Sequence, residues 1–366
     1  MFPTILDTIG NTPIITIANL NQPDEGQVLF KYERFNPGGS IKDRSAIFMI
    51  EEAEKRGLLK PGGTVIESSS GNFGISLAMI GAAKGYRVIA IVDPKTTSSN
   101  LALLKSFGAE VIVVNEKDDC GSYHKTRILL ANKLAKEIKD SYRPDQCFNL
   151  LNREAHYQNT AREMIEQCGG KLTTFITAVS TGGQLGGISK YLKSFLPEVQ
   201  IIGVDAMGSI IFGGEPHSYR IPGVGLGWTP HNLNLQHIDC AYKIPDEQAF
   251  LTARAFARYE GILMGPSSGA CALVALKVAQ NLSAEGRVVC MISDGGDRYI
   301  QTLFNDEWMK EQGFSLQVDI GTIRLMAKQL QPLKVSVPDN DNMGLDLMKY
   351  LNVPTTTLQM NEELGQ

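Results

Sequence analysis

The chain has 366 residues, of which 43% are hydrophobic, so it exceeds the usual domain size of about 100–200 residues and two domains are expected. Its 35 basic side chains are nearly balanced by 39 acidic ones, and no basic run is long enough to follow a phosphate backbone, which argues against nucleic acid as a partner. No window approaches the roughly 20 apolar residues of a membrane span, and no signal peptide is recognisable, so we expect a cytoplasmic protein without a membrane partner. The 6 cysteines are scattered without metal-ligand spacing, so neither a disulfide framework nor a metal site is predicted.

Short β-branched segments alternate with longer helical segments along most of the chain. Strands are predicted over residues 28–33, 64–67, 87–92, 110–114, 174–179, 200–204 and 287–292. Helices are predicted over residues 43–56, 74–84, 98–107, 122–138, 153–167, 183–194, 246–259 and 268–282. Several strands are apolar on both faces, which indicates an α/β fold with parallel sheets covered by helices. Beyond Trp308 the alternation ends, and this segment is interpreted as an added subdomain, an arm or a partly disordered tail.

The first motif is Asn36-Pro-Gly-Gly-Ser-Ile-Lys42, a turn before a predicted helix, with Ser40 as a candidate N-cap and Lys42 in the first turn. The positive end of a helix disfavours the ammonium form, and partial burial lowers the pKa of a lysine further. A lysine of this kind is the nucleophilic amine that Schiff-base chemistry requires. Taken alone, the motif fits an ordinary solvated lysine at a helix start as well.

A second motif, Ser68-Ser-Ser-Gly-Asn-Phe-Gly74, lies between a predicted strand and an apolar helix. Small residues and free N–H groups at a helix N-terminus can bind a carboxylate, and Asn72 can donate to a ring oxygen. The alternative is an ordinary strand-to-helix turn with a serine cap.

A third motif, Ser180-Thr-Gly-Gly-Gln-Leu-Gly-Gly187, again follows a strand and opens a helix, so its backbone can wrap closely around a phosphate. It is also close to a dinucleotide-binding fingerprint. However, it lies in the middle of the chain, and no acidic residue follows the next strand at the right spacing, Asp205 being the nearest.

The fourth motif, Met264-Gly-Pro-Ser-Ser-Gly-Ala270, is another strand-to-helix junction and presents the hydroxyl of Ser267. A neutral hydroxyl opposite a pyridine nitrogen leaves that nitrogen unprotonated, which favours β-elimination and β-replacement over transamination. By itself, Ser267 fits a helix cap more often than a cofactor contact.

With these four motifs in order, residues 4–309 resemble the fold-type II pyridoxal-phosphate enzymes, the cysteine synthase and cystathionine β-synthase family. The resemblance implies an enzyme that uses pyridoxal 5'-phosphate, with two domains of mainly parallel twisted sheets as in the tryptophan synthase β-chain. Residues 41–145 would form a smaller mobile domain, and residues 1–40 and 146–309 a larger cofactor-binding domain. Residues 310–366 lie outside the resemblance. Family members act on small amino acids and are commonly homodimers.

The resemblance also implies roles for individual residues. Lys42 would carry the cofactor and act as the catalytic base, while Asn72 would hold the 3'-oxygen and Ser267 would face the pyridine nitrogen. The cofactor phosphate would bind to Thr181, Gly182, Gly183 and Gln184. The substrate would contact Ser69, Ser70, Gly71, Asn72, Phe73, Arg127 and Ser180.

Further segments separate the branches of the family. Residues 204–213, 221–225, 259–262 and 294–299, together with the predicted helix start from Gly121 to Arg127, resemble N-(2-amino-2-carboxyethyl)-L-glutamate synthase. This branch serves siderophore and diaminopropionate biosynthesis and joins O-phospho-L-serine to L-glutamate. The chain is shorter than the branch near Cys147 and lacks the tyrosine that the branch offers to its substrate.

Several other functions stay open on the sequence. With the same cofactor, the enzyme could make cysteine from O-phosphoserine or O-acetylserine and sulfide, or it could be a cysteate synthase. A non-catalytic binding module is a remote alternative, because a binding role alone would not require Lys42, Asn72 and Ser267 together. A nicotinamide-dependent dehydrogenase rests only on the glycine pattern at 182–186.

Overall fold

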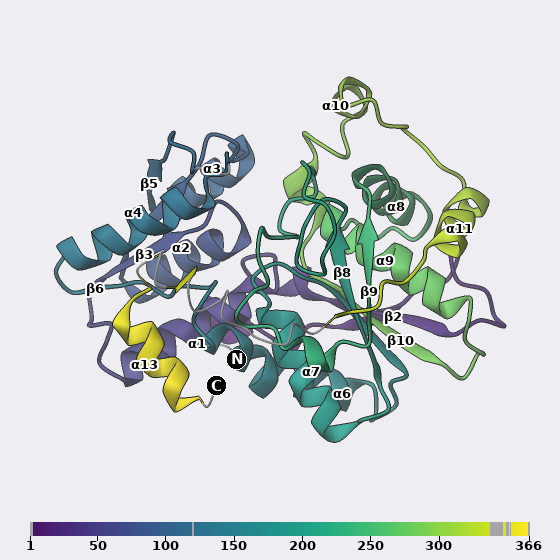
Figure 1. The fold of residues 1–366 in the computed structure, drawn as a ribbon, viewed down its shortest axis with the longest axis horizontal. Helices are drawn as coiled ribbons and strands as arrows, with labels where there is room; N and C mark the ends of the chain where they lie inside the picture. Colours follow the sequence, from purple (N-terminus) through teal and green to yellow (C-terminus); the bar gives the residue numbers. More distant parts are fainter. Residues whose placement is uncertain (1–2, 119–120, 337–346, 349–350, 352, 365–366) are drawn as a thin grey trace.

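The computed structural model describes residues 3–118, 121–336, 347–348, 351 and 353–364. Its strands form two sheets, which lie side by side in Figure 1. The larger sheet has six strands in the order β1 (Ile14–Thr16), β2 (Gln27–Tyr32), β10 (Arg287–Ile292), β7 (Thr174–Ala178), β8 (Gln200–Ala206) and β9 (Cys240–Ile244). The smaller sheet has four strands in the order β5 (Glu110–Val113), β4 (Arg87–Val92), β3 (Thr64–Ser68) and β6 (Ser141–Tyr142). Apart from the antiparallel pair β1–β2, the strand pairs in both sheets are parallel.

The helices cover both sheets. Those next to the smaller sheet are α1 (Lys42–Lys55), α2 (Asn72–Lys84), α3 (Ser98–Ser106) and α4 (His124–Glu137). The larger sheet is accompanied by α5 (Leu151–Ala155), α6 (Ala161–Gln167), α7 (Gly183–Phe195), α8 (Asp246–Tyr259) and α9 (Pro266–Ala279). Short 3-10 turns are η1 (Ile5–Thr8), η2 (Glu33–Phe35), η4 (Leu235–His237) and η5 (Gly296–Tyr299), and η3 (His156–Thr160) is a π-turn between α5 and α6.

The strand β4 shows why the sequence forms parallel sheets. Ile89 and Ile91 pack with α4 on one face, whereas Val88 and Ala90 belong to the core formed with α1 and α2 on the other. Because successive side chains of a strand point to opposite faces, a strand that is apolar throughout is stable only when both faces are covered. The predicted α/β fold class is therefore confirmed, and the solved structures compared below agree with it.

The structure differs from the predicted elements at several points. The strands β1, β6 and β9 were not predicted, and the predicted helix at 153–167 is interrupted by the π-turn η3. Ser40 does not occupy the N-cap position of α1, which belongs to Ile41, although its Oγ accepts a hydrogen bond from Lys42 N at 3.3 Å. Ser267 is not a helix cap either, because Gly265 is the N-cap of α9.

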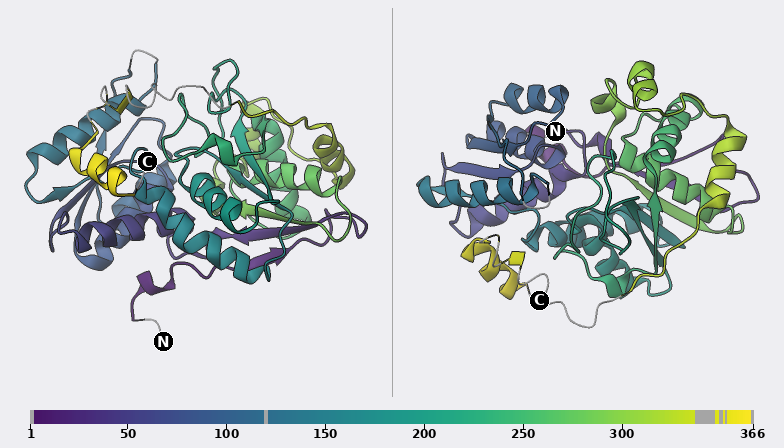
Figure 2. Two further views of the ribbon diagram at one scale, coloured as in Figure 1. Left: turned by 60° about the horizontal axis from the view of Figure 1, so that its bottom comes forward. Right: turned by 45° about the horizontal axis from the view of Figure 1, so that its top comes forward.

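The described parts of the C-terminal segment pack against both halves of the molecule. The helix α10 (Asp306–Glu311) is followed by α11 (Ile320–Gln329), which lies on α8 and α9, and Leu333 pairs with Ala241 of β9. The last helix, α13 (Thr355–Glu363), lies instead beside the smaller sheet, far from α11 in both views of Figure 2. Among the described residues, no helix is both long and apolar enough to cross a membrane.

Candidate active site

The carboxyl end of β10, the strand between β2 and β7, brings the predicted motifs together. The carbonyl oxygen of Ser293 accepts a hydrogen bond from Ile41 N at 2.8 Å, next to Lys42. The N–H of Ser293 donates to Ser268 Oγ at 3.0 Å, and its own Oγ accepts from Gln184 Nε2 at 3.3 Å. One residue at a strand end thus contacts three of the four motifs, as expected for sites of parallel α/β sheets.

The neighbouring Asp294 contacts the remaining motif. Its Oδ2 accepts hydrogen bonds from Asn72 Nδ2 at 2.8 Å and from the hydroxyl of Tyr299 at 2.7 Å. Arg298 donates to Asn72 Oδ1, so the amide of Asn72 is held at both ends. Asp294 is 1% exposed, and burial raises the pKa of its carboxyl group above the ordinary value. Its Oδ1 is buried and has no hydrogen-bond partner among the residues that the structure describes.

Lys42 is the first residue of α1 and is half-buried. No residue of the described part of the chain forms a hydrogen bond or an ion pair with its Nζ. Burial disfavours the ammonium form and lowers the pKa of Lys42 to about 8. The first turn of α1 is fixed by Arg44, whose guanidinium lies 2.6 Å from Glu33 Oε2 and 2.7 Å from Glu163 Oε2. The result is a helix start that is held in place and carries an amine of lowered pKa.

The predicted carboxylate loop precedes α2. The hydroxyl of Ser69 accepts a hydrogen bond from Gly74 N at 3.0 Å, whereas a Cβ built on Gly71 meets no atom within 4 Å. Ser70 and Gly71 are half-buried, so the loop leaves room beside them. Phe73 is different, because its side chain is 2% exposed and packs in the core of the smaller sheet. The structure therefore does not bring the Phe73 side chain to the site.

Arg127 extends from α4 to this loop. Its Nη1 donates to Ser70 Oγ at 3.1 Å and lies 3.0 Å from Asp93 Oδ2. The side chain is 5% exposed, and its Nη2 lies 3.4 Å from His124 Nδ1. Burial lowers the pKa of Arg127, while Asp93 acts in the opposite direction. Arg127 thus reaches the predicted substrate loop as part of an ion pair.

The predicted phosphate loop opens α7. Gly182 has φ +83°, a conformation that favours glycine, and a Cβ on Gly183 would overlap the side chain of Asn152. Asn152 Nδ2 donates to Thr181 Oγ1 at 3.0 Å, and Asn152 Oδ1 is buried without a partner in the described part of the chain. Ser180 lies at the start of the loop and donates to Gly225 O at 3.4 Å. The loop is therefore tightly packed from behind, which leaves its small residues to face a ligand.

Of the two remaining predicted cofactor residues, Gln184 is hydrogen-bonded to the sheet, whereas Ser267 is not hydrogen-bonded within the described residues. Gln184 Nε2 donates to Thr177 Oγ1 at 2.7 Å and to Ala178 O at 3.0 Å, so its side chain turns back toward the sheet and is not directed at the predicted phosphate. Ser267 lies in the first turn of α9, beside Ser268 and 7% exposed. Within the described residues, its hydroxyl makes no hydrogen bond.

Comparison with known proteins identifies the family. A family model described as "Pyridoxal-phosphate dependent enzyme" matches residues 5–294. The chain belongs to this pyridoxal-phosphate-dependent enzyme family. It is an enzyme that uses pyridoxal 5'-phosphate for β-replacement or elimination, as predicted from the sequence.

Three proteins similar to this pyridoxal-phosphate-dependent enzyme have names that state an activity. The chain is 42% identical over 301 residues to a probable cysteine synthase of Bacillus subtilis (strain 168), covering 81% of this chain and 95% of that protein. It is similar in structure to O-ureido-L-serine synthase, with a TM-score of 0.78 and 33% identity over 85% of this chain and 99% of the other. A hydrogen sulfide-producing enzyme from Fusobacterium nucleatum gives a TM-score of 0.76 and 33% identity, covering 82% of this chain and 100% of that one.

The residues of this pyridoxal-phosphate-dependent enzyme fit the cofactor. Lys42 offers a free amine of lowered pKa, which an aldehyde requires. The loop at Gly182 and Gly183 is a cradle that a side chain would fill, and the unpartnered Asn152 Oδ1 lies directly behind it. Bound there, the cofactor supplies the electron sink that stabilises negative charge at the substrate α-carbon.

Several residues of the site were missed as site residues by the sequence analysis. They are Asp93, Asn152 and Ser293, whereas Asp294 and Arg298 were noted only as part of the branch-specific segment 294–299. Asp93 follows β4, and Ser293 and Asp294 follow β10. The position of polar residues at the carboxyl ends of predicted parallel strands was the signal that could have found these three.

Proposed function

We propose that this enzyme replaces the phosphate of O-phospho-L-serine with L-glutamate, forming N-(2-amino-2-carboxyethyl)-L-glutamate and releasing phosphate. The supporting observation is the hydrogen bond of 3.1 Å between Arg127 Nη1 and Ser70 Oγ. It sets a guanidinium beside the loop proposed to bind the substrate carboxylate, where anionic groups of both substrates would enter. The resemblance of residues 121–127 and 294–299 to the glutamate-using branch points to the same reaction.

The residues would share the work as follows. The backbone N–H groups of residues 69–72 would hold the substrate carboxylate, while the side chain of Asn72 is left to the cofactor. Lys42 would remove the α-proton, which a pKa of about 8 permits near neutral pH, and phosphate would leave the β-carbon. The amine of glutamate would then bond to the β-carbon, and Lys42 would return a proton to the α-carbon.

The same proposal covers cofactor binding, the two domains and the oligomeric state. The enzyme would bind the cofactor phosphate on Thr181, Gly182, Gly183 and the backbone of Gln184, with Ser267 facing the pyridine nitrogen and Ser180 near the substrate. Residues 41–145 would form the smaller, mobile domain, and residues 1–40 and 146–309 the larger one. The protein would be a cytoplasmic homodimer.

A second candidate is a cysteine synthase that uses sulfide. Two observations favour it: the B. subtilis relative is a probable cysteine synthase, and the positive charge of Arg127 is already paired with Asp93 at 3.0 Å. A pocket for a small nucleophile needs no free cation, whereas a dicarboxylate does. A cysteate synthase, which would use sulfite, belongs to the same alternative.

Product analysis decides between these candidates. The purified enzyme, loaded with cofactor, would be incubated with O-phospho-L-serine or O-acetyl-L-serine and, separately, with L-glutamate, sulfide or sulfite, and the products identified by mass spectrometry. The proposal requires the glutamate adduct and release of inorganic phosphate. Formation of cysteine without any glutamate adduct would replace it with the second candidate.

Arg127→Ala provides a further test, with Lys133→Ala as a control on the exposed face of the same helix. We expect Arg127→Ala to raise the KM for glutamate about tenfold, because a charged hydrogen bond is lost. The Lys133→Ala control should leave the KM for glutamate and the KM for O-phospho-L-serine unchanged. An unchanged KM for glutamate in Arg127→Ala would remove this residue from the glutamate site.

A further inference from the structure

The helix α13 lies outside residues 5–294, which match the family model, yet it is hydrogen-bonded to the segment 146–152. Asn361 is 0% exposed, and both ends of its amide are used. Its Oδ1 accepts a hydrogen bond from Leu150 N at 2.9 Å, and its Nδ2 donates to Phe148 O at 2.9 Å. A buried side chain that pairs two backbone groups of a remote segment fixes that segment in place.

The segment 146–152 connects the two ends of the candidate site. At one end, Asn152 donates to Thr181 of the phosphate loop at 3.0 Å. Toward the other end, the ring of Phe148 lies parallel to that of Trp228, with 6.5 Å between centroids and 5° between planes. Trp228 meets the ring of His124 edge-on at 6.1 Å, and His124 contacts Arg127. Phe148 is therefore connected, through Trp228 and His124, to the side of the site where Arg127 reaches the substrate loop.

Described residues that precede α13 contact the same surroundings. Leu351 O accepts a hydrogen bond from Asn132 Nδ2 of α4 at 2.6 Å. Met348, Leu351 and Val353 pack in one apolar cluster with Ile128, Cys147 and Phe148. Met348, Leu351 and Val353 thus link α4 to the segment 146–152.

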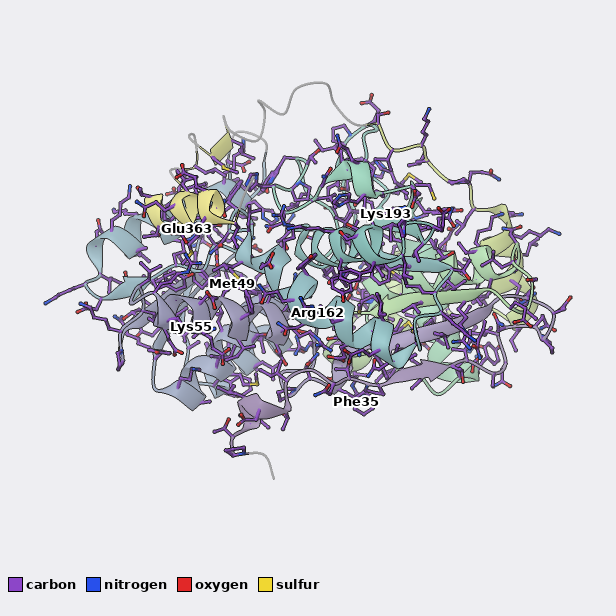
Figure 3. The ribbon with its side chains drawn as sticks, turned by 90° about the horizontal axis from the view of Figure 1, so that it is seen from below. Phe35, Met49, Lys55, Arg162, Lys193 and Glu363 are labelled. Atoms are coloured by element: carbon purple, nitrogen blue, oxygen red, sulfur yellow. The ribbon has the colours of Figure 1, made fainter. Side chains whose placement is uncertain are left out.

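The helix α13 is also anchored to α1, the helix that begins with Lys42. Glu363 forms an ion pair with Arg56 at the end of α1, and Met360 is buried in the core of the smaller sheet. Figure 3 shows Glu363 in the same half of the molecule as Met49 and Lys55 of α1. The anchoring makes α13 a fixed support for the segment 146–152.

We propose that Asn361 is a positioning residue for catalysis. By holding Phe148 and Leu150, it keeps Trp228 and His124 in place, and through them the wall of the site that admits the second substrate. The inference rests on the proposed site, but not on whether glutamate or sulfide is the second substrate. Loss of the Asn361 contacts would therefore weaken use of the second substrate while leaving cofactor attachment at Lys42 intact.

Fluorescence of Trp228 reports this arrangement directly. The chain has 2 tryptophans, so a Trp308→Phe background leaves Trp228 as the single emitter. In that background, Asn361→Ala is compared with Gln359→Ala, which alters an exposed residue of the same helix. Because Trp228 Nε1 is buried, we expect Asn361→Ala to shift its emission to longer wavelength and to increase quenching by acrylamide. Gln359→Ala should change neither.

Kinetics separate positioning from a general loss of structure. The second substrate is whichever of glutamate and sulfide the wild-type enzyme uses. We expect Asn361→Ala to raise its KM about tenfold, with kcat and the visible absorbance of the bound cofactor unchanged, because two buried backbone groups lose their partners. A structural role alone would lower the unfolding temperature and reduce the cofactor absorbance without separating KM from kcat.

The inference is overturned if Asn361→Ala has the Trp228 emission and the KM of the Gln359→Ala control. If Asn361→Ala does not fold, Asn361→Asp takes its place, since it keeps an acceptor for Leu150 N and loses the donor to Phe148 O. It should shift emission and KM in the same direction, and unchanged values would again overturn the inference. The emission requires no second substrate, so it remains informative if the proposed reaction fails.

Discussion

Asn72 and Asp294 lie 222 residues apart in the sequence and are joined by a hydrogen bond of 2.8 Å from Nδ2 to Oδ2. Arg298 donates to Asn72 Oδ1, so the amide cannot rotate without losing both contacts. An amide nitrogen carries two hydrogens, and Asp294 accepts one of them. The second is left to donate to an oxygen of the cofactor, which is the proposed role of Asn72.

Removal of the Asp294 carboxylate tests this arrangement. We expect Asp294→Ala to weaken pyridoxal phosphate binding about tenfold, because Asn72 loses the partner that orients it. The measurement is titration of the apo-enzyme with the cofactor, followed by visible absorbance. The control is Asp297→Ala, whose side chain is 54% exposed. Equal affinities of the two variants would show that Asp294 does not position Asn72.

Lys42→Ala should abolish the visible absorbance of cofactor bound to the purified enzyme, together with turnover, because no other amine occupies its place at the start of α1 in the described structure. Lys55→Ala, at the exposed far end of the same helix, should leave both intact. Circular dichroism verifies that the variants are folded. A Lys42→Ala protein that still turns over and absorbs like the wild type would contradict the assignment.

The pKa of Lys42 predicts a pH dependence for cofactor attachment. Burial lowers this pKa from 10.5 to about 8, so the neutral, reactive amine becomes the major form above about pH 8. The rate at which pyridoxal phosphate attaches to the apo-enzyme should rise with pH, reach half of its maximum near pH 8 and level off above that pH. Stopped-flow absorbance measures this rate. A rate that continues to rise toward pH 10 would indicate a lysine with an ordinary pKa.

Gly183→Ala should impair the phosphate loop, because the added Cβ would overlap the side chain of Asn152. We expect about a tenfold loss of affinity for pyridoxal phosphate, measured by the same titration, with a smaller effect on folding. Gly227→Ala is a matched control, since its Cβ meets no atom within 4 Å. An affinity of Gly183→Ala equal to that of the control would argue against a phosphate at this loop.

Glu163 should contribute to stability in a pH-dependent way. Burial alone would raise its pKa, but hydrogen bonds and charge from Arg44 and Lys31 outweigh burial and lower the pKa from 4.5 to about 2. The contribution is therefore fully present above about pH 4.5 and is lost as the pH falls toward 2. Urea unfolding of the apo-enzyme across this range should show that Glu163→Gln lacks a contribution on the order of 2 kcal/mol. The exposed Glu166→Gln should follow the wild-type curve, and a Glu163→Gln curve of wild-type shape would refute the pairing.

The sequence predicted the elements that have a local signature. Strands such as β4 are apolar along most of their length, so they could be predicted as buried strands. Each of the four motifs combines small residues with a predicted helix start, so each could be predicted as a ligand-binding loop. The strand β6 has two residues, and in β9 the lysine at position 243 interrupts the apolar run, so neither has a clear pattern. These two strands are set by their neighbours in the sheets.

The parts of the site that were missed depend on strand order. Ser293 acts on three motifs only because β10 lies between β2 and β7, which no local pattern encodes. The inward turn of the Gln184 side chain depends on Thr177 in the same way. The packing of α13 against Phe148 joins residues that are 213 positions apart and has no counterpart in the sequence pattern.

The place of β10 also bears on how the protein is made. Ser293 and Asp294 are synthesised after all four motifs, yet all four motifs form hydrogen bonds with these two residues. A nascent chain that ends before β10 would have the reactive lysine but no strand end to hold its loop. During synthesis, therefore, the aldehyde of the cofactor should meet an organised site only after β10 has left the ribosome and docked between its two neighbours.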